Sequence, residues 1–137
     1  MAFTESFIRP GRCKTSLTAH HLLFVEDDED LLEVFVRRFT RRGFLVSGAA
    51  HPHLALDLVQ TQPIHVAVVD RNLPDMDGLV LTNRMKQLKP NLTIIMLSGD
   101  SRPEAQSEAL ESGVHTFLLK PCRLAELETV IQSALFG

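Results

Sequence analysis

The sequence predicts an α/β fold: a doubly wound, five-stranded parallel sheet in the order 2-1-3-4-5, with helices on both faces. Three observations predict it. Five short apolar runs alternate with five segments of helical periodicity along the chain. The apolar runs are nearly continuous in hydrophobicity, as strands covered on both faces are. Strict alternation implies parallel strands joined by helical crossovers, and five such strands fit a doubly wound sheet.

Length and composition suit a single soluble domain. The chain has 137 residues, of which 45% are hydrophobic and 23% are charged, and its formal net charge is −3. This balance is typical of a globular protein, and it argues against direct nucleic acid binding, because such domains usually carry excess Lys and Arg. No apolar run reaches the roughly 18 residues of a membrane span. The opening residues lack the apolar centre of a secretory signal, so we expect a cytoplasmic protein.

The chain divides into a tail and a domain. Residues 1–19 are polar, with Pro10-Gly11 and scattered Ser and Thr, and we expect them to form a flexible N-terminal tail. The alternating pattern occupies residues 20–137. Cys13 and Cys122 lie far apart in the sequence and form no metal-binding or disulfide framework, so we expect both to be reduced thiols.

The first strand is expected in LLFVE, from Leu22, and a helix follows it. One face of that helix is apolar and consists of Leu31, Leu32, Phe35, Val36 and Phe39. Acidic residues precede the helix, and its end carries Arg37, Arg38, Arg41 and Arg42. Acids first and bases last complement the helix dipole, and Gly43 then provides a C-terminal cap. The arginine cluster is therefore explained without an RNA or phosphate ligand.

The later elements follow the same rhythm. Strands are expected in FLVSGA from Phe44, IHVAVVD from Ile64, LTIIMLS from Leu92 and VHTFLLK from Val114. Helices are expected near residues 53–62, 77–88, 102–112 and 123–135. Ser101 and Glu104 have the spacing of a capping box at the fourth helix, and Gly113 marks its end. That helix has a thin apolar face of Ala105, Ala109 and Leu110, whereas the last has a longer stripe of Leu124, Leu127, Ile131 and Leu135.

Polar residues stand at the carboxyl ends of four predicted strands. The first strand ends in Glu26-Asp27, the third in Asp70, the fourth in Ser98 and the fifth in Lys120. In a doubly wound sheet, ligands bind at this edge. Each residue taken singly also has a structural explanation, such as a turn residue or a solvated lysine. Their joint arrival at one edge favours a functional site.

The chemistry of this set is coherent. Crowded carboxylates are costly unless a cation joins them, and a site made only of oxygen ligands suits Mg²⁺. A carboxylate can also attack phosphorus and form an aspartyl phosphate. The metal and Lys120 would neutralise the charge on the transferred group. Ser98 could donate a hydrogen bond to a phosphoryl oxygen.

The sequence resembles the receiver domains of two-component response regulators, which have the CheY-like variant of the flavodoxin-like fold. The resemblance rests on four motifs, in the right order and at the right separations: LLFVEDDED, VVDRNLPDMDG, IIMLSGD and FLLKP. It covers roughly residues 20–137. Each motif is modest alone, whereas the ordered set is highly specific.

The resemblance implies a role for each site residue. Asp70 would be the phospho-acceptor, and Glu26, Asp27 and the backbone carbonyl of Asn72 would hold Mg²⁺ together with it. Asp28 competes with Glu26 for the second acidic role and could instead cap the first helix, although strand register favours Glu26-Asp27. Lys120 would contact the phosphoryl group. Two further residues, the hydroxyl of Ser98 and the aromatic ring of Phe117, would form the conformational switch.

Further expectations concern lifetime and partners. Asn72 and Asp100 lie two residues beyond Asp70 and Ser98, where they could border the path of a hydrolytic water and tune the lifetime of the phosphorylated state. The phosphoryl donor would be a sensor histidine kinase or a phosphotransfer protein. Phosphorylation would remodel the face formed by the fourth strand and helix and the fifth strand and helix, and so control an effector. The sequence leaves open whether the domain acts as a monomer or as a homodimer.

A few positions depart from the receiver pattern without removing a required chemical group. Ser98 stands where many relatives carry Thr, Gly99 where Ala is usual, and Cys122 where Phe is common. His65 replaces an acid at the start of the third strand. The chain ends at Gly137, directly after the last predicted helix, so we expect a stand-alone receiver or the receiver part of a longer regulator.

Three alternatives remain beside the receiver interpretation. An aspartate-nucleophile phosphatase of the haloacid dehalogenase type generally carries a second acid two residues after the nucleophile, where this chain has Asn72. A flavodoxin-like cofactor binder would place a phosphate loop after the first strand, but acids occupy that loop and repel anions. A degenerate receiver would have lost part of the acidic site, which is intact here. The receiver interpretation does not make the protein an enzyme with a separate substrate, although it would catalyse its own phosphorylation and dephosphorylation.

Overall fold

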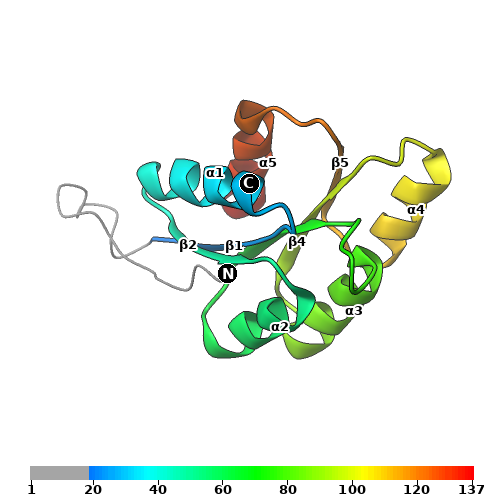
Figure 1. The fold of residues 1–137 in the computed structure, drawn as a ribbon, viewed down its shortest axis with the longest axis horizontal. Coiled ribbons are helices and arrows are strands. Elements are labelled where there is room, and N and C mark those ends of the chain that lie inside the picture. Colours follow the sequence, from blue (N-terminus) through cyan, green and yellow to red (C-terminus); the bar gives the residue numbers. More distant parts are fainter. Residues whose placement is uncertain (1–18) are drawn as a thin grey trace.

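The computed structural model describes residues 19–137, and it has the predicted doubly wound architecture (Figure 1). The five strands are β1 (His21–Val25), β2 (Leu45–Ala49), β3 (Val66–Asp70), β4 (Thr93–Ser98) and β5 (Thr116–Leu119). The five helices are α1 (Glu29–Arg41), α2 (Pro52–Thr61), α3 (Gly78–Leu88), α4 (Pro103–Glu111) and α5 (Leu124–Phe136). The predicted tail lies outside the described residues apart from Ala19, and so does Cys13.

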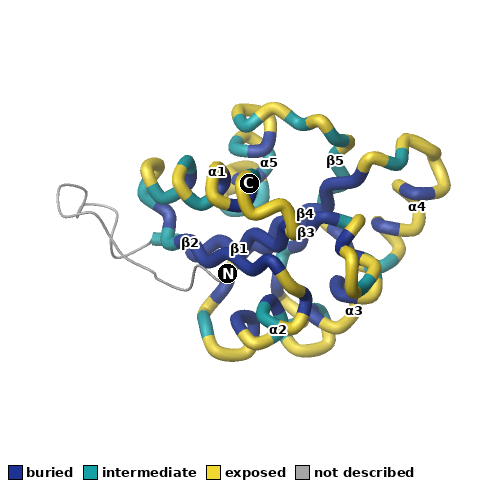
Figure 2. The backbone as a smooth tube through the Cα atoms, in the orientation of Figure 1, coloured by how far each residue is buried: buried dark blue, intermediate teal, exposed yellow. Residues whose placement is uncertain are grey.

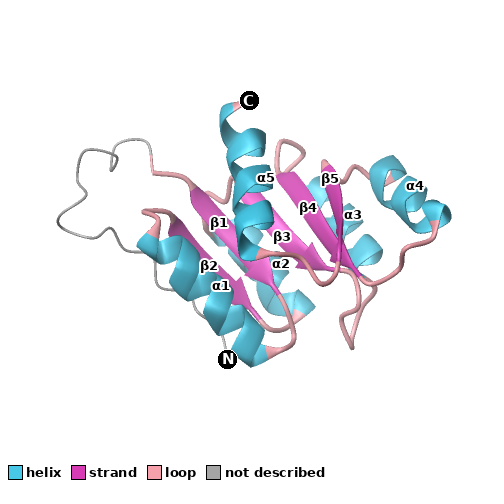
Figure 3. Ribbon diagram, turned by 90° about the horizontal axis from the view of Figure 1, so that it is seen from above, coloured by secondary structure: helices cyan, strands magenta, loops and turns pink. Residues whose placement is uncertain are grey.

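The sheet has the order β2-β1-β3-β4-β5, and all of its pairs are parallel. The central strand β3 pairs with β1 on one side and with β4 on the other, so that Val69 lies between Val25 and Met96. Because the strands run in one direction, their carboxyl ends meet at a single edge of the sheet (Figure 3). The predicted fold class is therefore confirmed.

Two apolar cores cover the two faces of the sheet, since successive strand residues point to opposite sides. Helices α1 and α5 pack on one face, and α2, α3 and α4 pack on the other (Figures 1 and 3). In β1, for example, Leu22 and Phe24 belong to the α1/α5 core, whereas Leu23 and Val25 belong to the opposite core. Strands β1 to β4 are buried almost throughout, whereas β5 at the edge has no buried residue (Figure 2). None of the helices within residues 19–137 is long and apolar enough to cross a bilayer.

Helix α1 begins and ends as its sequence indicates. Its N-cap is Asp28, whose carboxylate accepts hydrogen bonds from the N–H groups of Asp30 and Leu31. After the helix, Gly43 has a φ of +99°, a left-handed conformation that glycine adopts without steric cost. Arg38 and Arg42 near the end of α1 both lie against Glu128 of α5, so part of the arginine cluster joins two helices of one layer.

The start of α4 differs from the sequence-based expectation. The capping box of Ser101 and Glu104 is wrong: the N-cap of α4 is Arg102, and no side chain caps this helix. Instead, Asp100 accepts from the Arg102 N–H at 3.0 Å and also binds its guanidinium. The start of α3 agrees with the range expected for that helix, and its N-cap is Asp77, which accepts from the Leu79 N–H at 2.8 Å.

Helix α4 is also more lightly attached than its sequence suggested. Ala105 and Ala109 are fully buried, but Leu110, assigned from the sequence to the same apolar face, is 46% exposed. The helix therefore contacts the core through two small side chains. Its end agrees with the prediction, because Gly113 follows with a φ of +98°.

Candidate functional site

The carboxyl edge of the sheet gathers the five polar residues singled out in the sequence. Glu26 and Asp27 directly follow β1, and Asp70 and Ser98 are the last residues of β3 and β4. Lys120 directly follows β5. The register explains this convergence: Val25 pairs with Val69 and Asp70 pairs with Leu97. These side chains therefore reach the same end of the sheet from the ends of β1, β3, β4 and β5.

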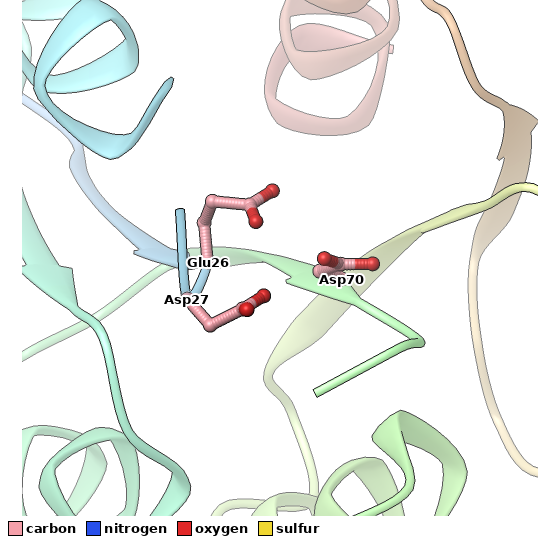
Figure 4. Close-up of side chains that lie close together, drawn as sticks. All are labelled: Glu26, Asp27 and Asp70. Carbon is pink, nitrogen blue, oxygen red and sulfur yellow. The ribbon is translucent and has the colours of Figure 1, made fainter. Parts of the chain in front are cut away.

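Three carboxylates form the centre of the site. One oxygen each of Glu26, Asp27 and Asp70 lies within 4.8 Å of the others, and Figure 4 shows the two β1-end side chains extending toward Asp70. Glu26 and Asp70 are both 3% exposed, whereas Asp27 is open to solvent. Asp28 is not part of this group, because its carboxylate caps α1.

The three acids have the chemistry of a divalent metal site. Oε1 of Glu26 is buried and has no hydrogen-bond partner among the described residues, an arrangement that is costly unless another group satisfies the oxygen. Burial raises the pKa of Glu26 to about 7, and the charge of Asp70 adds to the shift, while a hydrogen bond from the Asp28 N–H opposes it. A small cation bound by oxygen ligands would relieve both costs, and Mg²⁺ prefers such ligands.

Lys120 supplies the positive charge of the site. Its Nζ lies 3.0 Å from Oδ2 of Asp70 and 3.7 Å from Oε1 of Glu26. Burial lowers the pKa of Lys120, but the hydrogen bond to Asp70 and the charges of Glu26 and Asp70 raise it by more, so the net shift is upward. The lysine is therefore a fixed cation beside the Asp70 carboxylate. The peptide bond between Lys120 and Pro121 is cis.

The Asp70 carboxylate is oriented from both sides. Oδ1 accepts a hydrogen bond from the Asn72 N–H at 3.0 Å, and Oδ2 faces Lys120. The chain beyond it is held closely, because the Gly78 N–H donates to the Arg71 carbonyl at 2.9 Å. A Cβ at position 78 would lie only 2.6 Å from the Arg71 Cα, so glycine is required there. A carboxylate held in this way can act as a nucleophile.

Of the two residues proposed as a switch, Ser98 ends β4 at this edge, whereas Phe117 lies within β5, opposite Met96. Ser98 is fully buried, and its Oγ accepts a hydrogen bond from the Asp100 N–H at 3.0 Å. The Lys120 N–H donates to the Ser98 carbonyl at 2.8 Å, which joins the ends of β4 and β5. Phe117 is half-buried and packs against the core on the α4 side of the sheet. Hydrogen bonds from Arg102 lower the pKa of Asp100 to about 2.

One residue of this edge escaped the sequence-based reasoning. Arg71 directly follows Asp70, and its side chain is only 14% exposed. Its guanidinium lies 3.5 Å from Asp77 and 3.4 Å from Glu108 of α4. The signal available in the sequence was a basic residue beside an acidic turn, but its α4 partner is 37 residues away.

Comparison with known proteins shows which proteins this chain resembles. Residues 22–132 match the profile of the response regulator receiver domain. The TorCAD operon transcriptional regulatory protein TorR of Escherichia coli O157:H7 is 31% identical over 117 residues, which cover 85% of this chain and 50% of TorR. The DNA-binding transcriptional regulator NtrC of Proteus hauseri is 31% identical over 81% of this chain and 24% of its own length. The chain thus spans about half the length, or less, of these curated relatives.

Solved structures give the same result. A CheY-like receiver domain protein from Methanospirillum hungatei JF-1 superposes with a TM-score of 0.82 at 26% identity, over 86% of this chain and 94% of that chain. A response regulator from Burkholderia pseudomallei, described with a phosphorylated aspartic acid, a calcium ion and citrate, has a TM-score of 0.75 at 25% identity. That match covers 84% of this chain and 66% of the other.

Proposed function

Because this chain belongs to the response regulator receiver domain family, we propose that it accepts a phosphoryl group on Asp70 from a sensor histidine kinase or a phosphotransfer protein. The observation that carries the proposal is the convergence of Asp70 with a lysine at 3.0 Å and with two further acids. A carboxylate nucleophile, a fixed cation and oxygen ligands for a metal are the groups that phosphoryl transfer needs.

The chemical step is an in-line displacement at phosphorus. An oxygen of the Asp70 carboxylate attacks the phosphoryl group of a phosphohistidine, a P–O bond forms, and the P–N bond to the imidazole breaks. The leaving imidazole takes up a proton. Lys120 neutralises charge on the phosphoryl oxygens, and the Ser98 hydroxyl donates a hydrogen bond to one of them. The protein itself thus supplies the catalysis of its own phosphorylation.

Glu26, Asp27, Asp70 and the backbone carbonyl of Asn72 would hold Mg²⁺. When bound, the ion supplies positive charge that offsets the repulsion among the acids and the charge of the transferred group. The orphaned buried oxygen of Glu26 is the feature of this chain that fits such a ligand.

Phosphorylation would then switch the face formed by α4, β5 and α5. The aspartyl phosphate carries close to two negative charges, where the Asp70 carboxylate carries one, and it lies beside Ser98 and Lys120. Ser98 would move toward the new group, and Phe117 would move with it. A surface hollow of about 390 Å³ opens on this face, and residues of all three elements line it, including Gln106, Phe117 and Glu126. An effector that binds this face would sense the change.

Asn72 and Asp100 would tune the lifetime of the phosphorylated state. The side chain of Asn72 is exposed, and its N–H contacts the acceptor carboxylate. The N–H of Asp100 contacts the Ser98 hydroxyl. These contacts support a position for both residues at the border of the region from which water would approach the aspartyl phosphate.

The deciding experiment measures phosphoryl uptake with Mg²⁺ and acetyl phosphate, followed by mass spectrometry. Wild type should gain one phosphoryl group, and Asp70→Asn should gain none. Asp75→Asn removes an exposed carboxylate of the same turn and should behave like wild type. Normal phosphoryl uptake by Asp70→Asn would refute Asp70 as the phospho-acceptor. Catalytic turnover of small phosphate esters by the wild-type protein would favour a phosphatase.

A second measurement tests the proposed lifetime residues. The rate at which the phosphoryl group is lost should differ from wild type in Asn72→Ala and Asp100→Ala, and unchanged rates would refute their role.

A further inference from the structure

Arg71 connects the acceptor strand to the helix proposed to move. It is the residue directly after Asp70, and its Nη2 lies 3.4 Å from Oε1 of Glu108 in the middle of α4. Its Nε lies 3.5 Å from Oδ1 of Asp77, the N-cap of α3. A single guanidinium therefore joins the acceptor turn, α3 and α4.

The backbone of Arg71 has little freedom to follow a moving helix. Its N–H donates to the Leu97 carbonyl at 2.9 Å, and its carbonyl accepts from Gly78 at the same distance. Gly78 packs so closely that an added Cβ would lie 2.6 Å from the Arg71 Cα. A displacement of α4 must therefore break or stretch the contact of the Arg71 side chain with Glu108.

Helix α4 has few other attachments. Ala105 and Ala109 are its buried side chains, Leu110 is 46% exposed, and no side chain caps its N-terminus. Two alanines bury far less apolar area than the Leu, Phe and Ile residues that anchor α1 and α5. The ion pair with Arg71 therefore adds to a small set of contacts that hold α4 in this position.

The partial burial of the Arg71 guanidinium strengthens the argument that its ion pair with Glu108 stabilises the position of α4. Ion pairs between exposed groups contribute at most about 1 kcal/mol to stability. The Arg71 side chain is only 14% exposed, although that of Glu108 is 57% exposed. Nη1 of Arg71 is buried and lacks a hydrogen-bond partner within the described residues. Removal of Glu108 would leave this buried cation with one acceptor fewer.

We propose that Arg71 and Glu108 form a latch that holds α4 in its unphosphorylated position and thereby sets how readily a phosphoryl group on Asp70 switches the domain. The inference rests on the proposed function. A contact present in one conformation and broken in the other biases their equilibrium, and by linkage it weakens binding of any ligand that favours the second conformation. Arg71 is thus a positioning residue that acts through α4.

The test is Glu108→Gln in the full chain, with Glu111→Gln as the matched control. Glu111 is an exposed acid on the same helix, so both variants lose one negative charge from α4. Binding of beryllofluoride, a phosphoryl analogue, is measured by calorimetry with Mg²⁺. Amide hydrogen exchange of α4 is measured without either ligand.

Glu108→Gln should bind beryllofluoride about two- to fivefold more tightly than Glu111→Gln, the population shift expected for an ion pair of this exposure. Its α4 amides should exchange faster by a similar factor. Addition of Arg71→Gln to Glu108→Gln should produce no further increase in α4 exchange, because the pair is already broken.

The outcomes separate the latch from the function on which it rests. If wild type binds beryllofluoride and the two glutamate variants have equal affinities and equal α4 exchange, the latch is refuted and the proposed function stands. If wild type binds no beryllofluoride, the proposed function fails, and the coupling fails with it. Faster α4 exchange without tighter binding refutes the coupling and leaves only a structural role for the ion pair.

Discussion

At the scale of single residues, both edges of the sheet bury titratable side chains, and the carboxyl edge provides an opposite charge beside them. At the carboxyl edge, Glu26 and Asp70 are buried beside Lys120. At the amino edge, His21 is 1% exposed and its Nε2 lies 2.8 Å from the Ser47 hydroxyl. Burial lowers the pKa of His21 to about 4, and the charges of His65 and Lys89 add to the shift. The fold therefore requires His21 to be neutral.

This requirement predicts a loss of stability in mild acid. An unfolded His titrates near 6.5, so the contribution of neutral His21 is fully present above that pH and is lost as the pH falls toward 4. Between pH 7.5 and pH 5 the loss should be about 2 kcal/mol. Urea unfolding followed by far-UV circular dichroism measures it, since the chain has no Trp or Tyr for fluorescence.

The variant His21→Gln is the comparison for that experiment. Its amide cannot become charged but can still hydrogen-bond to Ser47, so its free energy of unfolding should fall by about 2 kcal/mol less over the same pH range. The difference in the free energy of unfolding between wild type and His21→Gln at each pH removes the effect of the carboxylates, which titrate in both proteins. Identical pH dependence in both proteins would show that His21 does not titrate on unfolding.

Residues at strand ends could be predicted from the sequence, whereas long-range ion pairs could not. Asp70, Ser98 and Lys120 end apolar runs, and the rule for parallel sheets places such residues at one edge. The partner of Arg71 depends on where α4 packs, which no local pattern determines. The closeness of Glu26 to Lys120 was inferable, but the orphaned oxygen of Glu26 was not, because it depends on side-chain orientation.

At the scale of elements, strong periodicity was a better guide than short motifs. Helix α1 has five apolar residues on one face and a cap at each end, and the structure agrees with all of these features. Helix α4 has nine residues and two buried alanines. Its predicted capping box was wrong because α4 begins at Pro103: a proline holds the residue before it in the extended region, and so Arg102 is the N-cap. The signal for this helix start was Pro103 itself rather than the spacing of Ser101 and Glu104.

In the turn between β3 and α3, too, the sequence does not reveal which contacts each acidic residue makes. Asp75 and Asp77 look alike in DMDG, yet Asp77 caps α3, whereas Asp75 lies 3.9 Å from His51 at the surface. Gly78 follows in the same motif, and its close approach to Arg71 leaves no room for a side chain. The sequence indicated the presence of a turn but not the partners of its acids.

At the scale of the whole molecule, the acidic site should couple metal binding to folding. Its carboxylates lie at the ends of β1 and β3, so they come together only when the sheet is assembled. At 100 times its dissociation constant, Mg²⁺ should therefore raise the free energy of unfolding by about 2.7 kcal/mol. Urea unfolding with Mg²⁺ or with a chelator measures the effect.

Asp27→Asn should separate the repulsion among the three carboxylates from the stabilisation that bound Mg²⁺ provides. Removal of one of three crowded carboxylates relieves repulsion, so this variant should be more stable than wild type without metal. It should also gain less stability from Mg²⁺, because one ligand has lost its charge. Equal stabilisation of both proteins by Mg²⁺ would indicate binding elsewhere on the surface.

The burial of the strands falls from the centre of the sheet toward the α4 side. Every residue of β3 is buried, whereas β5 at the sheet edge has only half-buried and exposed residues, and α4 rests on two alanines. Segments with little buried apolar area lose order first on heating. A temperature should therefore exist at which Asp70 still accepts a phosphoryl group while the α4–β5 face no longer has a defined shape. The protein would then receive its signal and fail to transmit it. NMR spectra recorded at rising temperature would show α4 and β5 resonances fading before those of β3, and simultaneous loss would exclude such a window.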